Sequence, residues 1–188
     1  MKTFIIVAIT LFSINCSSQK NLKYSIKGGI NYTWSYTDFS ANKVIYGFNI
    51  GGTIEKDIND LISVQTELNY NLKGIESVIK NTSPRIEAEN RLGYIDIPVL
   101  FQVKFAKRIS FQAGPQVGFL VYKNSEIDGN EVDLDITKTT FGFVGGFEID
   151  FLKKFYTQFR YEYGLSKIIQ NDSIKFSVIS LNLGCYFN

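Results

Sequence analysis

Apolar and polar residues alternate with a period of two along almost the whole chain beyond residue 20. In residues 61–73, Ile62, Val64 and Leu68 fall on one face, and Ser63 and Gln65 fall on the other. Such alternation predicts a β-strand with one apolar and one polar face. Eight segments follow this pattern: residues 24–34, 44–55, 61–73, 94–105, 109–122, 140–151, 155–166 and 176–187.

The eight predicted strands are long, and their connections alternate in length. A globular strand averages about 5–6 residues, whereas a tilted membrane strand needs about 9–11. Short connections lie at residues 56–60, 106–108 and 152–154, and longer ones at 35–43, 74–92, 123–139 and 167–174. This rhythm is typical of an up-and-down outer-membrane barrel, with short periplasmic turns and both termini on the periplasmic side.

Two hairpin registers and two prolines refine this prediction. Pairing Phe105 with Ile109, and Phe151 with Phe155, places apolar residues opposite apolar residues in both hairpins. Pro98 and Pro115 lie inside predicted strands, where a proline removes a backbone hydrogen-bond donor. We therefore expect a bulge or a local break of the ladder at each proline.

The first 18 residues have the order of a secretory signal peptide: a basic start, an apolar run at residues 4–12 and a small polar segment. The expected division is a signal peptide at residues 1–18 and a barrel domain at residues 19–188. Two alternatives remain, which are acylation of Cys16 in a lipoprotein and an uncleaved anchor. The apolar run is too short for the roughly 20 residues of a spanning helix.

Composition favours a membrane barrel over a soluble lipocalin-like carrier, which would have the same period. The chain has 16 Phe and 11 Tyr, more than a small barrel interior can hold, and its polar faces are rich in Gly, Ser, Asn and Gln. A solvated outer face would carry more Lys and Glu. The expected fold is therefore an all-β, eight-stranded antiparallel transmembrane barrel in the bacterial outer membrane, surrounded by lipid.

Charge and residue types exclude several functions. The net charge of +2 gives no field that would attract nucleic acid. The absence of His removes the Ser-His-Asp triad and His-ligated zinc, so an outer-membrane lipid hydrolase would lack the obvious base. Acidic residues within 126–135 could hold Ca²⁺, but without the ligand spacing of an EF-hand a solvated loop is the preferred interpretation. No catalytic residue, cofactor or metal site is predicted.

A set of charged residues falls on the polar, inward faces: Lys27, Glu55, Glu67, Asp96, Lys104, Glu148, Asp150, Arg160 and Glu162. These residues could form a proton or ion path, but a closed core of paired charges is the simpler interpretation, because eight strands leave no room for a pore. Gln158 is expected opposite Glu148. Arg160 is expected to contact Glu148, Glu162 or Glu67.

Seven stretches resemble a known family. They are residues 25–32 (SIKGGINY), 65–74 (QTELNYNLKG), 94–100 (YIDIPVL), 111–119 (FQAGPQVGF), 141–146 (FGFVGG), 161–165 (YEYGL) and 181–187 (LNLGCYF). In order and spacing they resemble the PorT-like outer-membrane β-barrel family of Bacteroidetes-type bacteria, although Asn188 replaces the usual terminal aromatic residue. The resemblance implies a small barrel, no shared activity and no catalytic residues. The family's namesake assists type IX protein secretion.

The expected function is that of a monomeric, non-enzymatic outer-membrane barrel with a structural or interaction role. Its outer loops would carry any specificity, because loops on a rigid scaffold tend to hold binding residues. The alternatives are an accessory component of type IX-like secretion, with secretion-machinery or envelope proteins as partners, and the lipocalin-like carrier.

Overall fold

A computed structural model describes residues 22–36, 41–43, 45–79, 86–127, 130–132, 135–168 and 175–187. The predicted signal peptide and Cys16 lie outside these residues. Eight long strands are present: β1 (Leu22–Tyr36), β3 (Ile45–Asp57), β4 (Ile62–Ile79), β5 (Ile86–Ala106), β6 (Ile109–Ile127), β8 (Thr139–Asp150), β9 (Phe155–Gly164) and β10 (Lys175–Tyr186). Two short strands, β2 (Ala41–Lys43) and β7 (Asn130–Glu131), pair with β4 and β6 respectively. The described residues include no helix of the length and apolarity needed to cross a membrane.

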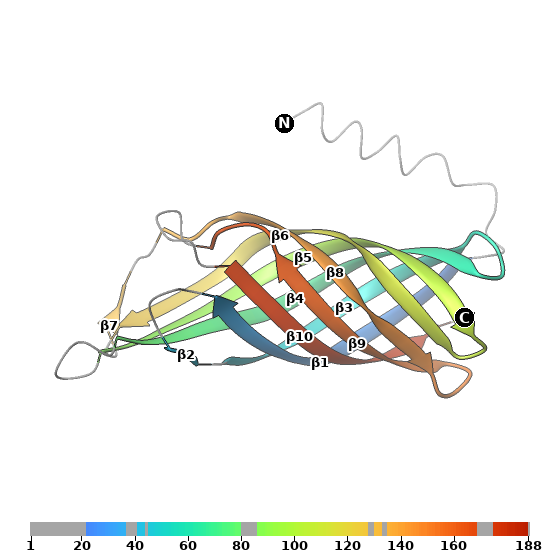
Figure 1. The fold of residues 1–188 in the computed structure, drawn as a ribbon, viewed down its shortest axis with the longest axis horizontal. Coiled ribbons are helices and arrows are strands. Elements are labelled where there is room, and N and C mark those ends of the chain that lie inside the picture. Colours follow the sequence, from blue (N-terminus) through green and yellow to red (C-terminus); the bar gives the residue numbers. More distant parts are fainter. Residues whose placement is uncertain are drawn as a thin grey trace, which may run out of the picture.

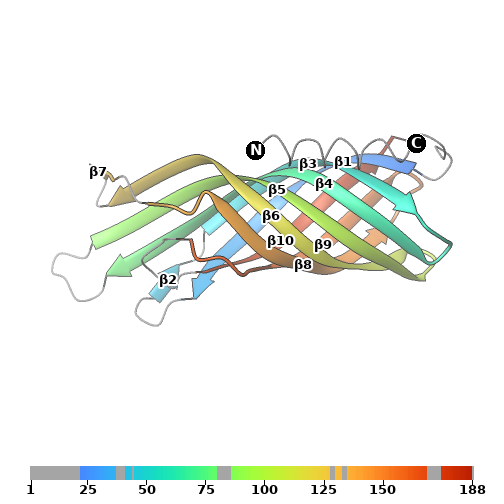
Figure 2. The same ribbon diagram turned by 90° about the horizontal axis from the view of Figure 1, so that it is seen from above.

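The eight long strands form a closed antiparallel barrel. Each pairs with its neighbours in the chain, and β1 closes the ring by pairing with β10, from Ser25 opposite Tyr186 to Tyr36 opposite Lys175. The strands wrap at a tilt around a long central axis (Figures 1 and 2). This arrangement confirms the predicted up-and-down topology of eight strands.

The barrel is taller on one side. Strands β4, β5 and β6 have 18, 21 and 19 residues, whereas β8, β9 and β10 have 12, 10 and 12. The additional length extends beyond the end opposite the short turns (Figure 1). The prediction that residues 74–92 form a loop is therefore wrong, because β4 runs to Ile79 and β5 starts at Ile86. In residues 75–79 apolar and polar residues do not follow a strict period of two, so the sequence pattern does not reveal that the ladder continues there.

Both predicted hairpin registers are present along the strands, and one of them changes at its turn. The register implied by pairing Phe151 with Phe155 is correct, with Asp150 opposite Tyr156 and Glu148 opposite Gln158. The register implied by pairing Phe105 with Ile109 holds from Tyr94–Leu120 to Lys104–Ser110, but the pair itself is wrong, since Ile109 lies opposite Ala106. The cause is a shift between Lys104 and Ala106, which adds one residue to β5 just before the turn.

The two prolines interrupt the ladder without shifting its register. Pairing between β4 and β5 skips from Thr66–Val99 to Asn69–Asp96, beside Pro98. Pairing between β5 and β6 skips from Pro98–Gln116 to Phe101–Ala113, beside Pro115. The expected local breaks are present at both prolines, but the register shifts in this pair of strands lie elsewhere.

The apolar faces of the strands point outward, as predicted. Phe101, Phe143 and Phe159 are 61%, 54% and 51% exposed, so they are not enclosed in a cavity. Outward aromatic residues occur along the whole apolar band, from Tyr24 and Phe155 near the short turns to Tyr32 and Trp34 toward the outer end. Along β1 the first and last of these residues, Tyr24 and Trp34, are ten residues apart. At about 3.3 Å per residue and a tilt of about 45°, the separation is roughly 23 Å, close to the apolar band of outer-membrane barrels.

Candidate functional site

The inward side chains form a polar core through most of the barrel. Because strand residues alternate between faces, the residues between the outward apolar positions all point to the axis. Buried polar and charged residues come from every long strand, including Lys27, Glu67, Gln102, Gln112, Glu148, Gln158, Arg160 and Asn182. Charges buried in this way must be paired and hydrogen-bonded.

Glu67 is the centre of this core. Arg160, on the opposite side of the barrel, donates two hydrogen bonds to its carboxylate, of 2.7 and 2.5 Å. Lys27 forms an ion pair of 2.6 Å with the same carboxylate, and Gln65 and Asn69 also donate to it. A paired guanidinium fork of this kind fixes the carboxylate more firmly than a single contact. Glu67 therefore links β1, β4 and β9.

Glu148 forms a second anionic centre beside the first. It accepts hydrogen bonds from Gln158 at 2.6 Å, and from Gln102 and Tyr186 at 2.9 Å each. Gln158 also accepts a hydrogen bond of 3.3 Å from Lys27, so the two centres are connected. The joined group balances the two cations Lys27 and Arg160 against the two carboxylates Glu67 and Glu148.

A further ion cluster lies nearer the outer end. Lys73 forms ion pairs of 2.8 Å with Asp96 and 2.5 Å with Glu162. Asn71 donates a hydrogen bond of 2.5 Å to Asp96, and the Lys73 ammonium lies 5.5 Å from the centre of the Tyr94 ring. The cluster joins β4, β5 and β9 above the Glu67 centre.

The opposite mouth, which the short turns mark as the periplasmic one, carries partly exposed ion pairs. Lys104 lies 2.7 Å from Asp57, and Lys23 lies 3.1 Å from Asp57 and 3.0 Å from Glu55. The two lysines remain about one third exposed, so these pairs contribute less than the enclosed ones.

A small polar chamber separates the Glu67 centre from the Lys73 cluster. Its volume is about 30 Å³, which holds roughly two waters. Five asparagines line it: Asn31, Asn49, Asn69, Asn71 and Asn182. Charged layers close the chamber on both sides, so it does not extend into a channel through the described part of the barrel.

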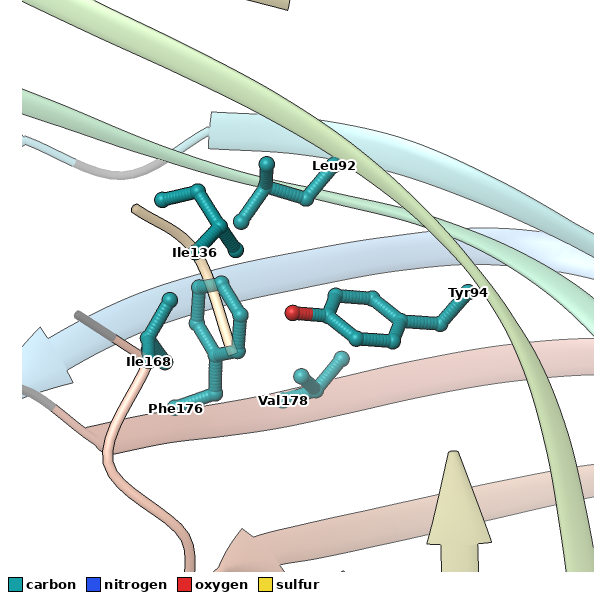
Figure 3. Close-up of a cluster of buried hydrophobic side chains, with 6 residues drawn as sticks. All are labelled: Leu92, Tyr94, Ile136, Ile168, Phe176 and Val178. Carbon is teal, nitrogen blue, oxygen red and sulfur yellow. The ribbon is translucent and has the colours of Figure 1, made fainter. Parts of the chain in front are cut away.

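The lumen changes character at its outer end, where an apolar cluster replaces the polar core. This outer cluster consists of Leu92, Tyr94, Ile136, Ile168, Phe176 and Val178. Figure 3 shows the Tyr94 hydroxyl pointing toward the Phe176 ring, and the two rings meet edge to face at 6.5 Å. Ile136 and Ile168 come from two connections between strands, which are joined by a hydrogen bond of 2.8 Å from Thr137 to Ile168. Two connections thus pack into the mouth and cover it.

The sequence-predicted residues fall into separate groups. Lys27, Glu67, Glu148 and Arg160 meet in the middle, Asp96 and Glu162 meet farther out, and Lys104 lies at the periplasmic mouth. Arg160 contacts Glu67, one of its three predicted partners. Lys73 was not singled out, although it is in phase with the inward residues of its strand.

The outer cluster was not predicted either. In β5 and β10 the inward positions change from polar to apolar toward the outer end, and this change was the available signal. Of the acidic residues considered for Ca²⁺, Asp128 and Asp133 lie outside the described residues, and only Asp135 has a described side chain, which is exposed. Among the described residues, no group of three or more metal-binding side chains is arranged to hold a metal ion.

Comparisons with known proteins agree with this architecture. No curated protein matches the sequence. Ail of Yersinia pestis, solved with the heparin analogue sucrose octasulfate, is 18% identical, with a TM-score of 0.55 over 89% of this chain and 99% of Ail. Neisserial surface protein A is 12% identical, with a TM-score of 0.61 over 87% and 97%. OprG of Pseudomonas aeruginosa is 12% identical, with a TM-score of 0.50 over 90% and 97%.

The family comparison covers most of the sequence. A family model described as an outer membrane protein beta-barrel domain matches residues 16–170. The match agrees with the closed eight-stranded barrel, its outward aromatic residues and its polar interior. This chain belongs to the outer membrane protein beta-barrel domain family and is a small β-barrel of the bacterial outer membrane.

Proposed function

We propose that this chain is a non-enzymatic, monomeric interaction protein that acts through its outer loops. The observation that carries the proposal is a closed lumen beneath an enlarged outer end. Paired charges fill the middle of the barrel and an apolar cluster covers its outer mouth. Transport through the interior is then disfavoured, and the surface outside the membrane is left to carry the function.

The outer end has the features of an interaction platform. β4, β5 and β6 extend beyond the shorter strands, and β2 and β7 pair with the edges of this extension. Covered edges protect it from uncontrolled strand pairing. Its loops therefore stand on a rigid base, as binding loops commonly do.

The charge of one loop suggests a class of partner. Residues 123–139 contain five acidic residues and two lysines. Ail, named for attachment and invasion, was solved with a sulfated heparin analogue. The acidic loop of this chain would repel such a negatively charged ligand and favours a partner with a basic surface.

The interior network has a structural role in this proposal. Lys27, Glu67, Glu148 and Arg160 fix the strands in the middle of the barrel, and Asp96 and Glu162 hold Lys73 farther out. Lys104 stabilises the periplasmic mouth. Residues 1–18 are a cleaved signal peptide, and residues 19–188 are the mature barrel.

Site-specific photo-crosslinking in intact cells tests the proposal. A photoreactive residue would replace Asp135 in the exposed outer loop, with a matched substitution at Lys154 in a periplasmic turn. We expect a discrete adduct at position 135, reduced when the remaining loop acids are changed to Asn or Gln, and no equivalent adduct at position 154. Absence of an adduct at 135 in cells of the native organism would contradict the proposal.

The resemblance to the PorT-like family supports a second candidate, an accessory role in protein secretion. A secretion component interacting with this barrel from the periplasm would contact the short turns. Adducts with secretion proteins at Lys154, and none at Asp135, would favour this second candidate.

A further inference from the structure

The periplasmic mouth contains a pocket that the proposed outer-loop function does not use. Its volume is about 310 Å³, at the lower end of the range of small-ligand sites. Six residues line it: Lys23, Arg108, Asp150, Leu152, Lys153 and Tyr186. They come from the start of β1, the β5–β6 turn, the end of β8, the β8–β9 turn and the end of β10.

The pocket holds charges of both signs, and Asp150 is not joined to the cations around it by a close ion pair. Arg108 and Lys153 form no ion pair with any described residue, whereas Lys23 is held by Glu55 and Asp57. Asp150 is half-buried and takes part in no close ion pair among the described residues, although Lys23, Lys104 and Arg108 lie near enough to attract its carboxylate. One carboxylate oxygen of Asp150 is shielded from solvent and lacks a hydrogen-bond partner among the described residues. Such a group is costly to bury, so a ligand that pairs with it would bind favourably.

The surrounding turns add a positive field. Lys107, Arg108, Lys153 and Lys154 lie in the two turns beside the pocket and are exposed. A cluster of one sign attracts ions of the opposite sign to its vicinity. A simple anion would pair with these cations but would leave the Asp150 carboxylate unpaired. A simple cation would pair with Asp150 but would face three cationic side chains.

We infer that this pocket binds an amino-acid group carrying an ammonium and a carboxylate on one carbon. The carboxylate binds Arg108 and Lys153, the ammonium binds Asp150, and the exposed Leu152 side chain contacts the ligand's carbon chain. Tyr186 forms the floor, since its hydroxyl donates to Glu148 deeper in the barrel. The mouth opens to the periplasm, where free amino acids and the diamino-acid ends of cell-wall peptides both present this chemistry.

Calorimetry with the full mature protein in detergent tests the site. The probes are free meso-diaminopimelate, acetate and methylamine. We expect binding of diaminopimelate at concentrations at which acetate and methylamine do not bind measurably. Asp150→Asn and Arg108→Gln should each weaken binding by about tenfold or more, since each removes the charge that strengthens a hydrogen bond to the ligand. Lys154→Gln, in the same turn as Lys153 but outside the pocket lining, should leave the affinity within about twofold of the unchanged protein.

Two further measurements complete the test. Sedimentation with purified cell-wall sacculi separates the sources: retention on sacculi assigns a cell-wall peptide, and binding of free diaminopimelate alone assigns a soluble amino acid. The heat-dependent gel shift of each variant shows that it is folded. The inference is overturned if the unchanged protein binds neither diaminopimelate nor sacculi. It is also overturned if folded Asp150→Asn binds diaminopimelate as tightly as the unchanged protein does. Neither result affects the outer-loop proposal, which depends on crosslinks at Asp135.

Discussion

The middle and the outer end of the lumen are built on the same strands but hold opposite kinds of core. In the middle, Glu67 and Arg160 join two opposite walls through paired charges. At the outer end, Leu92 and Phe176 are covered by Ile168, which comes from a connection rather than a strand. The middle core therefore depends on the barrel as a whole, whereas the outer cluster depends on how the loops fold back. A change in the first should destabilise the barrel, and a change in the second should free the loops.

The largest expected effect comes from removing the central cation. Arg160→Met leaves the buried Glu67 carboxylate with Lys27 as its remaining cationic partner. Breaking a buried pair in this way typically costs about 3–5 kcal/mol. The temperature at which the folded gel band converts to the unfolded band should fall markedly, while membrane insertion persists.

A second substitution identifies the partner. Glu67→Gln in the Arg160→Met background should recover part of the loss, because it removes the carboxylate that has lost its guanidinium partner and restores the balance of one cation to one carboxylate. Glu148→Gln in the same background is the matched control and should recover less, since Glu148 is held by Gln158, Gln102 and Tyr186. Equal recovery by the two would mean that Arg160 serves both carboxylates alike.

The next largest effect is expected on the outward, lipid-facing surface of the barrel, which surrounds both cores. Phe101 lies near the middle of the membrane band on β5, and Phe101→Arg should cost roughly 2–4 kcal/mol. Phe151→Arg is the matched control at the periplasmic level, where the same change should cost about 0–1 kcal/mol. Urea unfolding in lipid vesicles measures both. Equal costs at the two depths would contradict the position of the membrane band.

A smaller effect is expected in the outer cluster. Ile168→Ala removes one of the two loop side chains that cover it, at a cost of about 2 kcal/mol to the packing of that connection. Because the connection can open without unfolding the strands, the loss should appear as local opening. Protease added to intact cells should cleave this connection faster, while the gel-shift temperature changes less than it does for Arg160→Met. A fall as large as that of Arg160→Met would show that the two regions unfold together.

Much of the middle core could be predicted from the sequence. Period-two alternation assigns Glu67, Glu148 and Arg160 to the inward face, and hairpin geometry places Gln158 opposite Glu148. Hairpin geometry cannot decide which carboxylate Arg160 meets. Strands β4 and β9 are not neighbours, so their relative height depends on the stagger of the whole barrel. The sequence therefore could not distinguish Glu148, Glu162 and Glu67 as partners of Arg160, because that choice depends on the closed barrel.

The outer cluster was far less predictable. Ile136 and Ile168 lie in connections without periodicity, and nothing local indicates that they turn inward. Lys73 is in phase with Gln65 and Glu67 on its strand, so its inward position followed from the same pattern. Its importance depends on Asp96 and Glu162, which come from two other strands. Alternation predicts which face of the strand each residue lies on. Its partner across the lumen can be identified only from the three-dimensional arrangement.

The smallest expected effect is on ion conductance, which should be absent in the unchanged protein and in a variant that lacks the cover of the outer cluster. Eight strands leave an interior that side chains can fill, and the chamber of about 30 Å³ lies between two charged layers. Single-channel recording in planar bilayers should therefore give no stable open state for the unchanged protein. The double variant Ile136→Ala, Ile168→Ala removes the cover of the outer mouth but leaves Lys73 paired with Asp96 and Glu162, and Arg160 paired with Glu67. It should remain closed as well. Steady conductance of the unchanged protein would contradict the closed lumen, whereas conductance of the double variant alone would locate the barrier in the outer cluster and leave the charged layers permeable to ions.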